Sequence, residues 1–299
     1  MKYYLSMLFA LFFLFSNWHC SPKVSPDSSD TQKTHSKKKK RKNKAPKAIE
    51  PIPDAIGFSG QKLFVPIDSS AAFFQKKADL IKAQQDYKMV SSLENTIWYG
   101  RRTADLMDYK KAIDIFKKGI EQYPNSPELY RHRGHQYITL RQLDNAIMDF
   151  RKAADLSQSR NIEMEKDGIP NAKNISLSNL QFNIYYHWAL AHYLKGNFQR
   201  ASGLYQKCMD YSINSDLIVA TSDWLYMTYR RMGTDEKTAK WEALRFVNEQ
   251  MNIVENQSYH ERCLMYQGKR EITSMVDFNQ VEINNSTDDL DWITKAYGV

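Results

Sequence analysis

Apolar and small residues recur along the middle of the chain with a period of 34 positions. A shift of that length places Ala112 on Ala146 and Phe116 on Phe150. In both segments the small residue precedes the aromatic one by four positions, so the two share one face of a helix. The pattern therefore predicts that each unit is a pair of packed helices. Further matched pairs are Gly100 and Gly134, Leu106 and Leu140, Tyr109 and Leu143, Ile113 and Ile147, and Gly119 and Ala153.

The same pattern continues, more weakly, toward the C-terminus. Phe198, Ala201 and Tyr205 repeat the small–aromatic spacing, whereas a looser unit around Gly233 is out of step by three residues. We therefore predict a solenoid over 93–287, with units at about 93–126, 127–160, 182–215 and 219–252 and a weak fifth unit at 256–287. A packing helix is expected within 56–92, and an incomplete terminal helix at 288–299.

Pro124 closes the first unit, because proline cannot continue a helix and is well suited to start the next one. With the period and the small–aromatic alternation, this resembles the tetratricopeptide repeat (TPR). Segments such as 98–106 (WYGRRTADL) and 129–141 (LYRHRGHQYITLR) look like bacterial exported multi-TPR proteins of unassigned role. The resemblance implies an all-α fold, a superhelical solenoid of antiparallel helix pairs. Arg133 and Gln158 depart from the repeat, which usually has an apolar residue and a proline at these positions.

About 20 extra residues, 161–181, separate the second unit from the third. Within them, residues 168–171 (GIPN) form a turn signal, and residues 176–179 can cap the helix that starts near Leu180. An insertion of this size in a solenoid commonly projects to one face. We therefore expect it to shape the binding surface.

The N-terminus has the features of an export signal. Residues 3–15 are almost entirely apolar, which suits a signal-peptide core and is too short for a membrane-spanning helix. Cys20 then ends the segment, and the chain resembles a bacterial lipoprotein in which that cysteine is lipidated, although Trp18 and His19 are not the small residues expected before it. The expected location is exported and membrane-attached, periplasmic or outer-membrane. Another exported form, an uncleaved anchor and a cytosolic protein stay open.

The net charge of +8 lies entirely in an N-terminal tail. Residues 1–50 contain 11 Lys/Arg and 3 Asp/Glu, which leaves 31 of each in residues 51–299. Residues 21–55 contain very few apolar side chains that could be buried, so they are expected to be a disordered basic linker. Its run at 37–44 (KKKKRKNK) is either a solvated spacer or an attachment to an anionic membrane or cell-wall polymer. No specific nucleic acid partner is expected.

The sequence contains no motif for enzyme chemistry. A glycine-rich phosphate loop, GxSxG and HExxH are all missing. His132 and His135, with Glu128 one turn earlier, are the best metal-like cluster, but the neighbouring arginines would repel a cation. We therefore expect no metal, no cofactor and no catalysis. Cys208 and Cys263 are expected to be small apolar helix residues, with a disulfide between them left open.

What remains is a surface for a partner. The first helices of the units should line the concave face of the superhelix. Arginines interleaved with tyrosines suit a peptide with acidic groups or a free carboxylate, since guanidinium binds carboxylate bidentately. The alternative is that these are solvated residues with mutual ion pairs. We therefore predict a protein–protein interaction scaffold, the alternative being a protein that attaches through its basic tail. The groove candidates are Arg101, Asp105, Arg131, His135, Tyr186, Tyr193, Asp223 and Arg230.

Overall fold

The computed structural model describes residues 53, 55–64, 70–166, 171 and 173–271. The predicted signal segment, Cys20, the basic run at 37–44 and the terminal helix at 288–299 lie outside these residues. Within them, no helix is long and apolar enough to cross a membrane. The described elements are β1 (Ala55–Ile56), β2 (Lys62–Leu63), α1 (Ala71–Met89), α2 (Leu93–Asp105), α3 (Tyr109–Gln122), α4 (Pro127–Thr139), α5 (Leu143–Ser157), α6 (Leu180–Leu194), α7 (Phe198–Met209), α8 (Ser215–Arg231), α9 (Glu236–Leu244) and α10 (Gln257–Tyr266).

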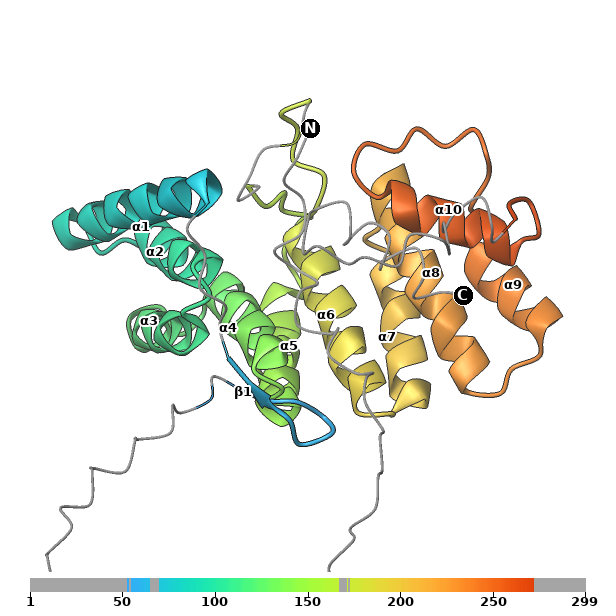
Figure 1. Cartoon of the computed structure of the whole chain (residues 1–299), viewed down its shortest axis with the longest axis horizontal. Coiled ribbons are helices and arrows are strands. Elements are labelled where there is room, and N and C mark those ends of the chain that lie inside the picture. The colour runs from blue at the N-terminus through green and yellow to red at the C-terminus, as the bar shows by residue number, and fades with distance from the viewer. Residues whose placement is uncertain (1–52, 54, 65–69, 167–170, 172, 272–299) are drawn as a thin grey trace, which may run out of the picture.

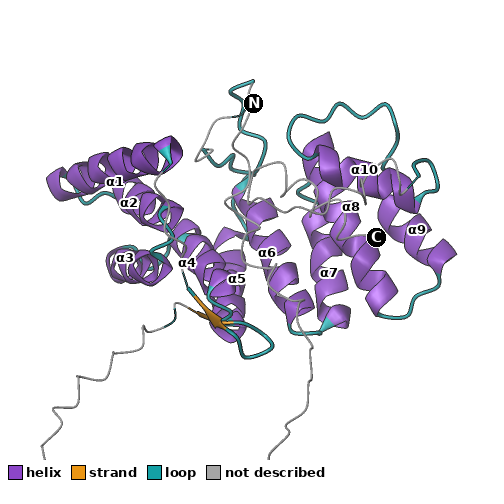
Figure 2. Cartoon of the chain, in the orientation of Figure 1, coloured by secondary structure: helices purple, strands orange, loops and turns teal. Residues whose placement is uncertain are grey.

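These helices stack as successive antiparallel pairs, which confirms the predicted all-α solenoid (Figure 1). The pairs are α2/α3, α4/α5, α6/α7 and α8/α9, and α10 begins a further unit by packing on α8. First helices of neighbouring units also touch, α2 on α4, α4 on α6 and α6 on α8. These first helices therefore form one continuous face, called here the inner face. The strands β1 and β2 form a small antiparallel hairpin (Figure 2).

Polar caps set where the helices begin. Ser92, Ser126, Asn179 and Asn214 precede the four first helices, and each side chain accepts the backbone N–H of the residue three positions on. Such a bond satisfies one of the N–H groups left unpaired at a helix start. Pro127 adds a fixed φ at the first position of α4. The sequence thus specifies the starts of α2, α4, α6 and α8 locally.

The turns between paired helices all use a left-handed residue at the same place. Met107 and Arg141 both have φ of 62°, and Gly196 and Gly233 have φ of 75° and 81°. A residue with a Cβ is strained there, whereas glycine adopts this conformation freely. The first two units therefore make the turn with a strained residue, and the next two make it without strain.

Small residues let the helices approach as the period predicts. Ala112, Ala146, Ala201 and Ala239 are fully buried at equivalent places. A Cβ added to Gly100 would overlap the ring of Phe116, and one added to Gly134 would lie 3.1 Å from Phe150. Arg133, which departs from the repeat pattern, donates to Asp149 on α5 through Nε and Nη2, both at 2.7 Å. A salt bridge thus replaces the usual apolar contact between α4 and α5.

Hydrogen bonds join the connection between α9 and α10 to α8. The Asp216 carboxylate accepts backbone N–H groups from Val254, Glu255 and Asn256. Three such bonds to one buried carboxylate fix where α10 begins. Cys263 on α10 and Cys208 on α7 are both free and buried, so the disulfide left open by the sequence is not formed.

Candidate functional site

The inner face of the first units surrounds a carboxylate from the insertion. Glu165 forms an ion pair with Arg131 of α4, with 2.9 Å between Oε2 and Nη2, and accepts a hydrogen bond from the Asn183 amide of α6. Arg131 is only 4% exposed. The imidazole of His132 also faces Glu165, with 3.9 Å between Nε2 and Oε1. We call Arg101, Arg131, His132, Asn183 and the bound Glu165 the glutamate site.

Arg101 of α2 completes this site from the neighbouring unit. Its Nη1 donates to the carbonyl oxygen of Lys166 at 2.8 Å, and its guanidinium lies 4.5 Å from the centre of the Trp98 ring. Burial and the charge of Arg131 lower the pKa of Arg101 to about 10, while Glu165 acts in the opposite direction. Two guanidinium groups therefore lie near Glu165, with Asp105 as a second carboxylate that acts on Arg101, and the site favours an anion.

The backbone around Glu165, residues 161–166, is called here the inner segment, and it forms one isolated antiparallel β-bridge, between Met164 and Asn179. The Gln181 side chain of α6 donates to the Asn161 carbonyl at 2.7 Å and accepts the Glu163 N–H at 3.2 Å. The Glu163 carbonyl accepts from Leu180 at 2.8 Å, and the Glu165 N–H donates to the Ser178 carbonyl at 3.0 Å. Side chains and backbone near the start of α6 thus bind a short stretch of extended backbone.

Three histidines beside Arg131 add no charge at neutral pH. Burial and the charge of Arg131 hold the pKa of His132 well below its usual value. Burial and neighbouring His187 do the same for His135, and burial with Arg131 lowers the pKa of His187 to about 3. The His187 Nδ1–H donates to the Asn183 carbonyl at 2.7 Å, and the rings of His135 and His187 meet edge to face. The positive charge of the site therefore comes from its arginines.

The inner face of the later units is closed in a different way. Asp223 of α8 forms a bidentate pair with Arg262 of α10, with 2.9 Å between Oδ1 and Nε, and the two side chains are 0% and 1% exposed. Burial raises the pKa of Asp223, and the charge of Arg262 opposes that shift. Tyr186 of α6 reaches the hydroxyl of Tyr259 at 3.4 Å. Helix α10 therefore covers this part of the inner face as a structural element.

The predicted groove residues divide between these places. Arg101, Arg131 and His135 lie together around the glutamate site, and Tyr186 and Asp223 lie in the closed region beneath α10. That any of the predicted residues binds a partner stays a prediction. The remaining three lie elsewhere: Asp105 pairs with Arg102 at 3.0 Å, Tyr193 packs on Trp224 with ring centres 5.2 Å apart, and exposed Arg230 donates to the Thr234 carbonyl at 3.0 Å.

Several residues of the site were not predicted from the sequence. Glu165 lies in the insertion, where no period indicates which side chain turns inward. Asn183 and Gln181 lie within the first turn of α6, and polar residues next to a predicted cap are the only signal for them. Arg262 lies 39 residues from Asp223, in a unit whose repeat pattern is weak.

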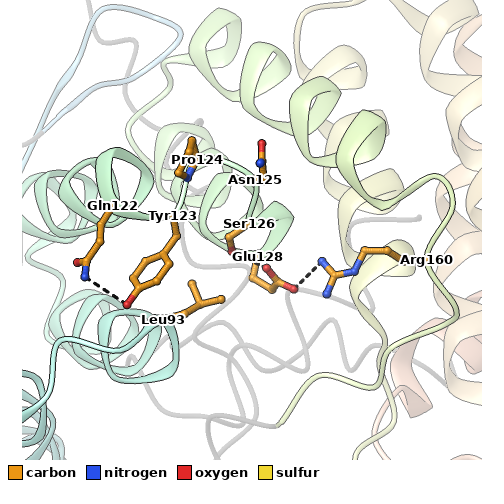
Figure 3. Close-up of a pocket in the computed structure, with 8 residues that line it drawn as sticks. All are labelled: Leu93, Gln122, Tyr123, Pro124, Asn125, Ser126, Glu128 and Arg160. Atoms are coloured by element: carbon orange, nitrogen blue, oxygen red, sulfur yellow. Dashed lines mark hydrogen bonds and ion pairs between the residues drawn. The ribbon is translucent and has the colours of Figure 1, made fainter.

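The metal-like cluster of the sequence has other partners. Glu128 pairs with Arg160 at 2.9 Å, and His132 accepts a hydrogen bond from Arg131 at 2.8 Å. No group of three potential metal ligands occurs in the described part of the chain. The Glu128–Arg160 pair instead forms one wall of a depression of about 500 Å³ (Figure 3). Its other lining residues are Leu93, Gln122, Tyr123, Pro124, Asn125 and Ser126.

Fold and site together define a TPR-like helical-repeat protein with a carboxylate held on its inner face. Three solved structures with similar folds are BtubC from P. vanneervenii (13% identity, 78% of this chain and 89% of that chain, TM-score 0.47), a thermophilic TPR protein of Thermus thermophilus (14%, 66% and 92%, 0.45) and MamA (17%, 69% and 98%, 0.43). No protein-family model and no curated protein matches the chain. The likeness concerns the fold alone.

Proposed function

We propose that this chain is a protein-interaction scaffold that binds an acidic segment of a partner on the inner face of its first units. The observation that carries the proposal is the glutamate site, where Arg101, Arg131 and Asn183 come from three different first helices and act on one short acidic stretch. Charge-assisted bonds between guanidinium and carboxylate are the strong hydrogen bonds of protein recognition. The proposal includes no catalytic step.

The closed region beneath α10 supports this choice of surface. Asp223 and Arg262 satisfy each other in a fully buried pair, so no charge is left there for a ligand. The glutamate site differs, because Arg131 pairs with a loop carboxylate and Arg101 beside it donates to a backbone carbonyl. Arg131 Nε is also buried without an acceptor among the described residues. An unpaired buried donor is costly, and a further acceptor from a partner would satisfy it.

Two adjacent arginines on α2 provide a matched test. Arg101 reaches the inner segment, whereas Arg102 pairs with Asp105, and both guanidinium groups lie over the Trp98 ring. Binding is measured on an array of peptides, each made in a Glu and a Gln version. We expect Arg101→Ala to reduce the preference for the Glu versions and Arg102→Ala to leave it unchanged. Equal behaviour of the two variants would contradict the proposal.

We further propose that the protein is exported and tethered through Cys20, which the apolar N-terminal segment supports. Cys20→Ser should then release the protein from the membrane fraction. Retention of that variant after a high-salt wash would contradict the tether.

A second candidate function is attachment to an anionic polymer through the basic tail. The distribution of charge favours this function, because the whole net charge of +8 lies in residues 1–50 and residues 51–299 contain equal numbers of acidic and basic residues. Binding through the tail weakens steeply with salt and disappears when residues 21–50 are deleted, whereas binding through the inner face weakens less with salt and persists after the deletion.

A further inference from the structure

Resting on the proposed function, we propose that the inner segment is an internal ligand. Residues 161–166 occupy the acidic-peptide site of the same chain, and a partner peptide of the same chemistry competes with them for it. The proposal adds to the function both a description of the ligand and a means by which the chain restrains its own binding.

The contacts of the inner segment specify what a competing ligand must offer. Gln181 takes one carbonyl and one N–H of an extended backbone, at Asn161 and Glu163. Arg131 binds the side-chain carboxylate of Glu165, two residues after Glu163. Arg101 donates to the backbone carbonyl of the following residue, Lys166. The ligand class is therefore an extended peptide with a glutamate in a fixed place.

A basic residue directly after that glutamate also fits. Lys166 Nζ lies 2.5 Å from Glu94 Oε1 on α2. The inner face does not select the side chains at the positions of Ile162 and Met164, because these two residues are 44% and 46% exposed. The required residue is thus the glutamate, with tolerant positions before it, and the exposed Lys166–Glu94 pair shows that a basic residue after it is accepted.

The exposure of Ile162 and Met164 also indicates that the inner segment can detach from the inner face. Burial of an apolar side chain is what normally anchors a loop to a core, and the two apolar side chains here remain nearly half exposed. The contacts that hold residues 161–166 to the inner face are hydrogen bonds and ion pairs. An external peptide of matching sequence can replace such contacts one for one. The Asp223–Arg262 pair lacks this property, because both partners lie on packed helices.

The test uses the chain's own sequence as the probe. A labelled peptide RNIEMEK, which copies residues 160–166, is titrated into the full wild-type chain and into Glu165→Gln. The variant removes the charge that holds the internal segment and keeps its size. Glu163→Gln is the matched control, because Glu163 lies in the same segment but pairs with Arg160 and not with Arg131. A second peptide, RNIEMQK, lacks the carboxylate that Arg131 would bind.

We expect Glu165→Gln to bind RNIEMEK about tenfold more tightly than the wild type, because an internal competitor on a short connection acts at an effective concentration of about a millimolar. Glu163→Gln should bind like the wild type, and RNIEMQK should bind weakly to all three proteins. Equal affinity of Glu165→Gln and wild type for RNIEMEK, or no binding to the variant, would overturn the proposal.

A measurement on the wild type covers the case in which Glu165→Gln fails to fold. Excess unlabelled RNIEMEK should speed amide exchange at Glu163 and Glu165, because the N–H groups of these two segment residues are bonded while the segment is in place and lose their acceptors when the peptide displaces it. Unchanged exchange at these amides would show that residues 161–166 are a fixed structural element that the peptide does not displace. Failure of the internal ligand is distinct from failure of the proposed function, which the Arg101 and Arg102 variants test on unrelated peptides.

Discussion

The two halves of the inner face each bury an arginine with a carboxylate, but the partner has a different origin in each. In the later units Arg262 and Asp223 both lie on helices, and both are almost completely buried. In the first units Arg131 is 4% exposed, while the side chain of its partner Glu165 lies outside any helix and is 14% exposed. The same chemical pair therefore joins two packed helices in one half and a helix to a loop segment in the other.

This difference shows why burial of an arginine does not by itself identify a binding residue. An ion pair between two packed helices forms when the protein folds, and its charges are not available to a ligand. A pair with a loop segment is limited by how tightly that segment is held, which here depends on polar contacts. The origin of the carboxylate, and not the depth of the arginine, distinguishes the two pairs.

The largest expected effect comes from breaking the pair between helices. Arg262→Ala leaves the Asp223 carboxylate buried and uncompensated, which should lower the free energy of unfolding by about 3–5 kcal/mol. Denaturant titration measures this loss. The control is the double variant Asp223→Leu with Arg262→Met, which should recover most of the stability because no buried charge remains. A small effect of Arg262→Ala would remove the contrast between the two halves.

Arg131→Ala should have a smaller effect on the same measurement. The Glu165 carboxylate can turn toward solvent once its partner is lost, so we expect about 1.5–3 kcal/mol, the range for hydrogen bonds to charged groups. If Arg131→Ala destabilised the protein as much as Arg262→Ala, Glu165 would be a core residue and the inner segment a fixed part of the fold.

The histidines of the first units should make stability depend on pH. The pKa of His187 is about 3 in the folded protein, below its ordinary value of 6.5, so the unfolded chain binds one more proton between these pH values. Stability therefore falls as the pH drops from 6.5 toward 3, by about 1.4 kcal/mol per pH unit for this residue. Unfolding free energies at several pH values should show a slope reduced by that amount in His187→Gln. An unchanged slope would mean that His187 is protonated in the folded protein.

The smallest effects should come from the turns between paired helices. Gly196→Ala places a Cβ at positive φ, where no other atom lies within 4 Å, so backbone strain alone should cost about 1 kcal/mol. Met107→Gly removes strain at the equivalent turn of the first unit and should stabilise the protein by up to about 1 kcal/mol. Melting temperatures should move in opposite directions. Shifts of the same sign would show that the two turns are not equivalent.

Local pattern was enough to predict the fold. The period of 34 residues follows from the need to bury a small residue such as Ala112 against the helix before it, and the caps at Ser126 and Asn214 mark helix starts directly. Helical spacing also placed Arg101 and Arg131 on the same face, because that face is a property of each helix alone.

The partners of these arginines could not be predicted in the same way. Glu165 reaches Arg131 through a connection without periodicity, and its inward direction depends on contacts with Gln181 and Ser178 that form only in the folded chain. The pairing of Asp223 with Arg262 depends on where α10 crosses α8, which the backbone bonds to Asp216 determine. Asp223 therefore had the spacing of a groove residue and the environment of a core residue.

An occupant that belongs to the same chain also limits how fast a partner can associate. At low concentration of an acidic partner, the observed association rate should rise in proportion to that concentration. At high concentration it should level off at the rate at which residues 161–166 detach, because no partner can enter sooner. The hydrogen bonds that Gln181 and Arg101 make to this segment would then determine the response time of the scaffold as well as its affinity.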